Sequence, residues 1–145
     1  MKFATIVVNI FCILVVLKHT HAGCTGAPGC IYIMQEVEMP GTFYKVGGVL
    51  HNCGKQVDDR RTDLQTGNVR QLVVRQRYWV NNCRRAEAAA HRAVKERYGA
   101  YYGGGTEWYY VEGNRYANFE GRIVEAVAPY QGPPHGLLKF ITKLN

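Results

Sequence analysis

Gly29-Cys30-Ile31-Tyr32-Ile33-Met34 and Phe43-Tyr44-Lys45-Val46-Gly47-Gly48 are the two stretches from which the fold of this chain is predicted. In both, apolar residues recur with a period of two, which is typical of half-buried β-strands. Met39-Pro40-Gly41 between them is a turn signal, so the pair predicts an antiparallel hairpin in which Tyr32 faces Tyr44 or Lys45. Because strands in general prefer aromatic and β-branched residues, this pattern alone indicates structure and not chemistry.

The first 22 residues differ in composition from the rest of the chain. Lys2 precedes an almost wholly apolar run over residues 3–17, and the segment ends in the small residue Ala22. This is the pattern of a secretory signal peptide, and the run is too short for a membrane-spanning helix, so an uncleaved anchor is the weaker alternative. We expect a secreted, extracellular protein that has no membrane segment after cleavage, with a domain over residues 23–128 and a C-terminal tail over residues 129–145.

Cleavage after Ala22 removes one of the five cysteines and leaves Cys24, Cys30, Cys53 and Cys83. An even number of cysteines in an oxidising compartment predicts two disulfides, for which three connectivities are possible. A zinc site is the weaker alternative because no CxxC pair occurs. If the third strand is antiparallel to the first, all four thiols lie near one end of the sheet, close enough to pair.

Loss of Lys2 and Lys18 with the signal peptide leaves 16 basic residues against 11 acidic ones. Such an excess suits a polyanion, with nucleic acid the first candidate and an acidic glycan or a mineral matrix the others, although many secreted proteins are basic without a specific partner. Arg75 and Arg77 alternate with Trp79, which predicts a basic and aromatic strand face. The candidate nucleic-acid contacts are Arg61, Arg75, Arg77, Arg84 and Arg85.

The remaining elements follow from periodicity and from helix start and stop signals. Helices are predicted over residues 57–65, 83–98 and 116–128, and strands over residues 72–80 and 106–111, with a tyrosine-bearing loop at 99–105. The helix over residues 83–98 is rich in alanine, which is the strongest helix former. Together with the hairpin, the order β-β-α-β-α-β-α is an α+β pattern.

Several short segments between Gly29 and Glu112 together resemble the GIY-YIG endonuclease superfamily, in a branch with phage- and fungus-type members. The two halves of its signature are matched by Cys30-Ile31-Tyr32 and Tyr44-Lys45-Val46-Gly47. Its helical arginine is matched by Arg60, its Glu-x-x-x-His helix by Glu87 and His91, and its Glu-Trp-aromatic motif by Glu107-Trp108-Tyr109. Cys30 stands where the family has glycine, Lys45 or a displaced Tyr44 stands for the second tyrosine, and the asparagine of the homing enzymes has no clear match.

This resemblance implies a small central antiparallel sheet of three to four strands flanked by helices, here stabilised by disulfides, and a metal-dependent phosphodiesterase. Tyr32, with Lys45 or Tyr44, would activate or orient the attacking water. Arg60 would stabilise transition-state charge through bidentate hydrogen bonds that lysine cannot copy. Glu107 would bind one Mg²⁺ or Mn²⁺, and His91 would position water or act as a general acid.

The leading hypothesis from the sequence is therefore a secreted, metal-dependent nuclease that acts on extracellular nucleic acid, with Tyr32, Arg60, His91 and Glu107 around one shallow site. The alternative is a catalytically inactive protein on the same scaffold that binds a polyanion or forms part of an extracellular or biomineral matrix. The tyrosine count, the loop at residues 99–105 and the missing motif residues favour that alternative. The metal dependence of nucleic-acid cleavage separates the two.

Overall fold

The structure, a computed structural model, describes residues 24–37, 42–99 and 107–132. Along the chain it contains β1 (Gly29–Glu36), β2 (Thr42–Leu50), α2 (Lys55–Thr66), β3 (Leu72–Val80), α3 (Cys83–Tyr98), β4 (Trp108–Val111), the 3₁₀ turn η3 (Gly113–Arg115), α4 (Tyr116–Val127) and the 3₁₀ turn η4 (Ala128–Tyr130). The predicted signal peptide, the Met39-Pro40-Gly41 turn and most of the predicted tail lie outside the described residues. No helix in the described ranges is long and apolar enough to cross a membrane.

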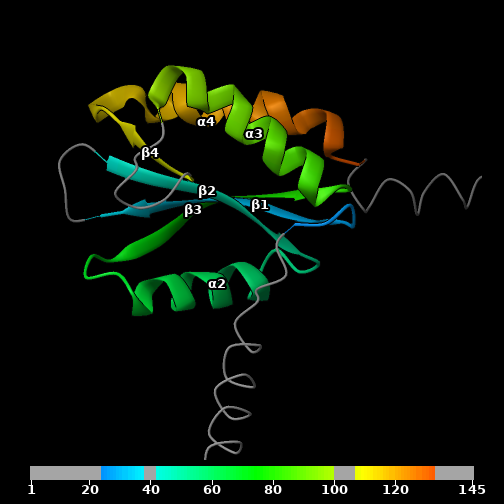
Figure 1. Cartoon of the computed structure of the whole chain (residues 1–145), viewed down its shortest axis with the longest axis horizontal. Coiled ribbons are helices and arrows are strands. Elements are labelled where there is room, and N and C mark those ends of the chain that lie inside the picture. Colours follow the sequence, from blue (N-terminus) through cyan, green and yellow to red (C-terminus); the bar gives the residue numbers. More distant parts are fainter. Residues whose placement is uncertain (1–23, 38–41, 100–106, 133–145) are drawn as a thin grey trace, which may run out of the picture.

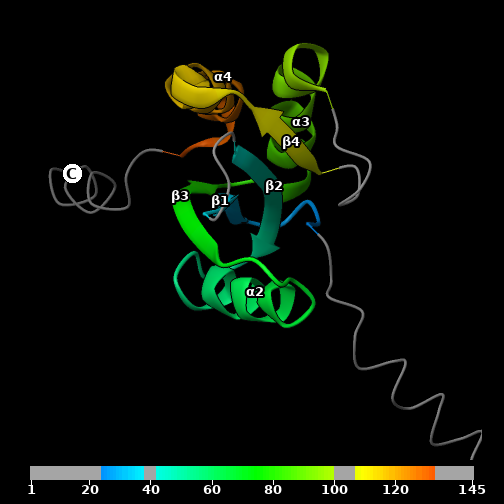
Figure 2. The same ribbon diagram turned by 90° about the vertical axis from the view of Figure 1, so that its left-hand side faces the viewer.

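The four strands form one antiparallel sheet in the order β3-β1-β2-β4. Helix α2 covers one face of this sheet, and α3 and α4 lie side by side over the other (Figures 1 and 2). The prediction of an α+β fold with a small antiparallel sheet flanked by helices is confirmed.

Strand β1 is buried on both faces, and the prediction that it is half-buried is wrong. Residues 30–34 are all at most 1% exposed. Ile31 and Ile33 belong to the core under α3 and α4, whereas Tyr32 and Met34 pack with Val57 of α2. Alternate side chains of β1 therefore point into two different cores, because helices cover both faces of this central strand.

The register of the hairpin also differs from the prediction. Tyr32 lies opposite Gly47, while Lys45 lies opposite Met34 and Tyr44 opposite Gln35. Position numbers of paired residues add up to 79 along the whole hairpin, so the partner of Tyr32 lies two residues beyond Lys45 on β2. Tyr32 therefore faces a residue without a side chain.

Helix α3 has the predicted bounds, whereas α2 begins two residues earlier and ends one residue later than predicted, and α4 ends one residue earlier. In α3, the Asn82 side chain accepts a hydrogen bond of 3.1 Å from the Arg85 N–H, and Gly99 closes the helix with a φ of 63°. In α4, Phe119, Ile123 and Val127 are buried at intervals of four residues, which places one apolar stripe against the sheet. Local capping thus bounds α3, whereas α4 has no side-chain cap and owes its position to its buried face.

Two disulfides join the four predicted cysteines, Cys24 to Cys83 and Cys30 to Cys53, with 5.1 Å between the Cα atoms of each pair. The first links the N-terminal segment to the start of α3. The second links β1 to the loop that precedes α2. The prediction of two disulfides is confirmed, and of the three possible connectivities the structure selects this one.

The predicted basic face of β3 does not exist as one surface. A register shift between Ile33 and Met34 of β1 places a bulge in β3 at Arg75. As a result, the Arg75 guanidinium lies over the Tyr116 ring of α4, 5.5 Å from its centroid, whereas Arg77 forms an ion pair of 2.5 Å with Asp58 of α2. The two arginines reach opposite faces of the sheet, and the prediction that they share one face is wrong.

Candidate active site

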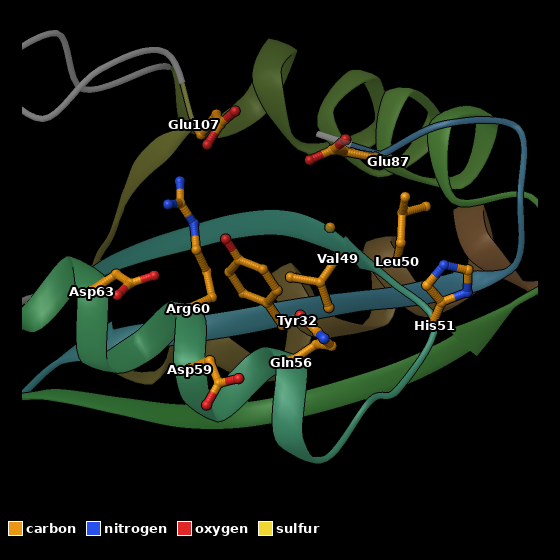
Figure 3. A pocket seen from close by; sticks show the side chains of 11 residues that line it. Tyr32, Val49, Leu50, His51, Gln56, Asp59, Arg60, Asp63, Glu87 and Glu107 are labelled. Carbon is orange, nitrogen blue, oxygen red and sulfur yellow. The ribbon is translucent and has the colours of Figure 1, made fainter. Parts of the chain in front are cut away.

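A pocket of about 630 Å³ opens where β4 stops short of the end of β2. The strand β4 pairs with Thr42–Lys45, so the Gly47–Leu50 end of β2 has no paired strand on its outer side among the described residues. The pocket fills this place between α2 and α3 (Figure 3). Its lining consists of Tyr32, Gly48, Val49, Leu50, His51, Gln56, Asp59, Arg60, Asp63, Glu87 and Glu107.

Three of the five predicted catalytic residues line this pocket, although they come from different elements. Tyr32 comes from β1, Arg60 from α2 and Glu107 from the residue before β4. Figure 3 shows the Arg60 guanidinium and the Tyr32 hydroxyl pointing toward the carboxylate of Glu107 across the pocket. The structure thus brings together side chains that are up to 75 positions apart in the sequence.

Tyr32 reaches the pocket because Gly47 lies beside it. A Cβ at Gly47 would lie 2.4 Å from the Tyr32 hydroxyl oxygen and 2.7 Å from Cζ, so a side chain there would displace the ring. Burial raises the pKa of Tyr32 to about 12, and hydrogen bonding to the nearby positive charge of Arg60 offsets part of that effect. At neutral pH, Tyr32 is therefore a neutral hydroxyl that can donate a hydrogen bond.

The predicted residue Lys45 lies behind the pocket and is not part of its lining. Its ammonium group forms an ion pair with Oε2 of Glu107, and its side chain is only 6% exposed while that of Glu107 is 43% exposed. The same ammonium group lies 5.7 Å from the centroid of the Trp108 ring. Lys45 thus holds Glu107 at one carboxylate oxygen and leaves the other oxygen available.

The fifth predicted residue, His91, is half-buried on α3 and does not line the pocket. A ring nitrogen of His91, a carboxylate oxygen of Glu87 and a carboxylate oxygen of Glu107 nevertheless all lie within 4.8 Å of one another. Nδ1 of His91 is 2.6 Å from the Tyr109 hydroxyl, and Nε2 is buried without a hydrogen-bond partner among the described residues.

Glu87 is the site residue that sequence reasoning left out of its candidate set. The signal was present, since Glu87 and His91 are four residues apart and therefore project from the same side of α3. Gly48 permits the approach of this helix, because a Cβ there would lie 3.4 Å from Cδ of Glu87 and 2.0 Å from Sγ of Cys24. The Gly48 backbone lies close enough to the Glu87 carboxylate to offset part of the rise in its pKa.

The electrostatics of this group favour a cation. Burial raises the pKa of Glu87, and the negative charge of Glu107 raises it further. Burial also lowers the pKa of His91, which keeps the imidazole neutral near pH 7 and so able to coordinate a metal. Two carboxylates and an unpartnered imidazole nitrogen at this spacing fit a divalent metal ion.

The charge of the pocket is opposite to the charge of the whole chain. Four carboxylates line it, from Asp59, Asp63, Glu87 and Glu107, against the single guanidinium of Arg60. A phosphate group would meet net negative charge here in the absence of a bound cation. The lining therefore suits a phosphodiester only when a metal ion accompanies it.

None of the arginines predicted to contact nucleic acid lines the pocket. Arg75 and Arg77 lie on β3, and Arg84 and Arg85 in the first turn of α3; all four are exposed. Arg61 is half-buried on α2, beside a second, shallower hollow formed with β3. The structure disperses these residues over several surfaces.

Comparison with known proteins relates this architecture to a family. No curated protein and no solved structure matches the chain significantly. The sequence profile of one domain family matches residues 29–128, which include every described strand, the three helices and all the residues of the pocket. The chain belongs to the T5orf172 domain family.

Proposed function

We propose that the chain is a secreted, metal-dependent phosphodiesterase of the GIY-YIG type that cleaves extracellular nucleic acid. The observation that carries the proposal is the convergence of Tyr32, Arg60, Glu87 and Glu107 on one pocket. The T5orf172 family, which is associated with nucleases of phage and homing-endonuclease type, supports the same chemistry. The two disulfides support secretion, because such bonds persist in oxidising compartments.

Arg60 is the residue suited to the phosphate. Its planar guanidinium group donates paired hydrogen bonds to two phosphoryl oxygens and stabilises the charge that develops in the transition state. Its positive charge lies close enough to Tyr32 to lower the pKa of that hydroxyl, which offsets part of the effect of burial. A bound divalent metal would act as a Lewis acid toward the phosphate.

Tyr32 orients the attacking water or the leaving oxygen. Because its pKa is raised to about 12, it does so as a hydrogen-bond donor and not as a phenolate base. Lys45 keeps Glu107 in place for the metal, and one ligand atom each of Glu87 and His91 lies within 4.8 Å of a Glu107 carboxylate oxygen. Each group thus has one role. Arg60 binds phosphate, Tyr32 donates a hydrogen bond to the attacking water or the leaving oxygen, and Glu87, His91 and Glu107 bind the cation.

The test is cleavage of labelled DNA and RNA by the mature protein with Mn²⁺, Mg²⁺ or EDTA. We expect metal-dependent cleavage that falls about 100-fold or more in R60K, since lysine loses the bidentate geometry. The matched control is R122K, an exposed arginine of α4 outside the pocket lining, which should cleave like the wild type. Cleavage in EDTA, or equal losses in both variants, would contradict the proposal.

The second candidate function is polyanion binding without catalysis. The exposed arginines Arg75, Arg77, Arg84 and Arg85 favour it, because they lie outside the pocket and can bind phosphate or sulfate without any metal. A protein that binds DNA or heparin in a salt-dependent manner but cleaves neither DNA nor RNA with any metal would have this function.

A further inference from the structure

Two carboxylates of the pocket lining and one imidazole beside the pocket form a set of metal-ligating side chains. Glu87 and His91 come from α3 and Glu107 from the start of β4, and one ligand atom of each lies within 4.8 Å of the other two. This spacing allows a single cation to contact all three. The family resemblance implies Glu107 alone as the metal ligand, so Glu87 and His91 enlarge the site.

Each of these three side chains is held in place by a separate neighbour. Lys45 pairs with Glu107, the Gly48 backbone lies against the Glu87 carboxylate, and the Tyr109 hydroxyl contacts Nδ1 of His91 at 2.6 Å. Neighbours of this kind orient ligands in metal centres and are a characteristic part of them. A surface cluster of carboxylates would have no reason to be fixed at three points.

The free nitrogen of His91 indicates what the group is built to bind. Nε2 is buried and has no hydrogen-bond partner among the described residues, which is costly for a polar atom. When Nδ1 carries the proton and donates it to the Tyr109 oxygen, Nε2 keeps a lone pair, and one ring nitrogen of His91 lies within 4.8 Å of a carboxylate oxygen of Glu87 and of Glu107. A metal cation can accept that lone pair and offset both carboxylate charges at once.

We propose that Glu87, His91 and Glu107 bind a first-row transition-metal dication, represented by Mn²⁺, in preference to Mg²⁺. The preference follows from the imidazole, since Mg²⁺ favours oxygen ligands and retains its water, whereas transition metals accept nitrogen readily. The inference rests on the metal dependence in the proposed function and adds to it the ligand set and the class of metal.

The experiment measures binding and not activity. Free Mn²⁺ is quantified by electron paramagnetic resonance during titration of the mature protein, and Mg²⁺ is added as a competitor. We expect one Mn²⁺ per chain and a dissociation constant for Mg²⁺ that is larger by about 100-fold or more. In H91Q, where an amide oxygen replaces the nitrogen, this ratio should fall by about tenfold or more, because Mn²⁺ loses its preferred ligand and Mg²⁺ does not.

Two further variants keep the test decisive if H91Q folds poorly. Y109F removes the hydroxyl that orients His91 and should weaken Mn²⁺ binding by about 10-fold or more. H51Q alters an exposed histidine of the same pocket that is outside the three-residue group, and it should bind Mn²⁺ like the wild type. Equal Mn²⁺ and Mg²⁺ affinities in the wild type, an unchanged ratio in H91Q, or an equal loss in H51Q would overturn the inference.

The outcomes separate this inference from the proposed function. Selective Mn²⁺ binding that depends on His91, without cleavage of any nucleic acid, supports the metal centre and contradicts the nuclease. Cleavage supported by Mg²⁺ and undiminished in H91Q, together with an unchanged metal ratio, supports the nuclease and overturns the transition-metal centre.

Discussion

Gly47 and Gly48 are adjacent on β2 but allow close packing on opposite faces of the sheet. Gly47 makes room for the Tyr32 ring on the α2 side, and Gly48 makes room for Glu87 and for the Cys24–Cys83 disulfide on the α3 side. Neither residue has a positive φ among the backbone angles of the structure, so their role is one of space and not of backbone conformation. The absence of two side chains thus brings Tyr32 and Glu87 to the same pocket.

Replacement of Gly47 by alanine tests this at the level of one methyl group. The new Cβ would lie 2.4 Å from the hydroxyl oxygen of Tyr32, which is 1% exposed, so the ring would have to shift out of its packed position. We expect the free energy of unfolding to fall by about 1–3 kcal/mol, together with loss of metal-dependent cleavage. Chemical denaturation with urea measures the first quantity.

Gly121→Ala is the matched control for this substitution. A Cβ at Gly121 would meet no atom within 4 Å, and the residue lies inside α4, where alanine is the better helix former. We expect this variant to be more stable by about 0.5–1 kcal/mol. If Gly47→Ala were as stable as the wild type, the close contact between Tyr32 and Gly47 would not be a constraint.

Among the elements, α2 depends most on ion pairs and disulfides for its attachment to the rest of the fold. Val57 is its only fully buried residue, and Leu64 packs partly against the same core. Its ion pair between Asp58 and Arg77 is exposed and so worth at most about 1 kcal/mol. The Cys30–Cys53 disulfide, which ends two residues before α2 begins, is the strongest tie between this helix and β1.

Removal of that disulfide in C30A/C53A should therefore loosen α2 before other elements. We expect the free energy of unfolding to fall by about 3 kcal/mol, since the bond closes a loop of 23 positions in the unfolded chain. Amide hydrogen exchange should accelerate most in α2, which carries Arg60. In the control C24A/C83A, α2 should keep its exchange rates relative to the sheet; equal acceleration of α2 and α3 in C30A/C53A would contradict the prediction.

At the scale of the whole molecule, tyrosines packed into both cores make the stability of the fold depend on pH in the alkaline range. Burial raises the pKa of Tyr32 and of Tyr109 to about 12, and it also raises the pKa of Tyr78 and Tyr116. Tyr32 lies on the α2 side of the sheet, whereas Tyr109 belongs to the core on the other side and Tyr78 packs against it. Ionisation of these phenols is thus opposed by the fold in several places at once.

The sign of the pH dependence follows from these shifts. A tyrosine has a pKa near 10 in the unfolded chain, so the folded state holds protons that the unfolded state releases above that pH. The stabilisation from these groups is complete below about pH 10, and it is lost as the pH rises from about 10 to 12. We expect the urea midpoint to be constant at pH 8–9 and to fall steeply above pH 10.

Y78F provides the control, because it removes one of these phenols at a distance from the pocket. Tyr78 donates a hydrogen bond of 3.0 Å to Glu120 of α4, so the variant should be less stable at pH 8 but should lose less stability between pH 10 and 12. Tyrosine absorbance near 295 nm should rise together with unfolding. A midpoint that stays constant to pH 11 would be inconsistent with the raised pKa values.

Much of the local structure was determined by the sequence alone. The strand over residues 72–80 and the helix over residues 83–98 have the predicted bounds, because periodicity, alanine content and a capping asparagine act over a few residues. The even number of cysteines after residue 22 also predicted two disulfides, because that inference depends on composition alone. The short motifs also contained Tyr32, Arg60 and Glu107, which meet at the pocket.

Only the tertiary structure decided how these elements face one another. It set Tyr32 opposite Gly47, moved Arg75 and Arg77 to opposite faces through a bulge, and selected the disulfide connectivity. It also joined Glu87 and His91 to Glu107. Each of these features is a contact between segments far apart in the chain, and register, bulges and helix placement depend on packing that no local pattern specifies.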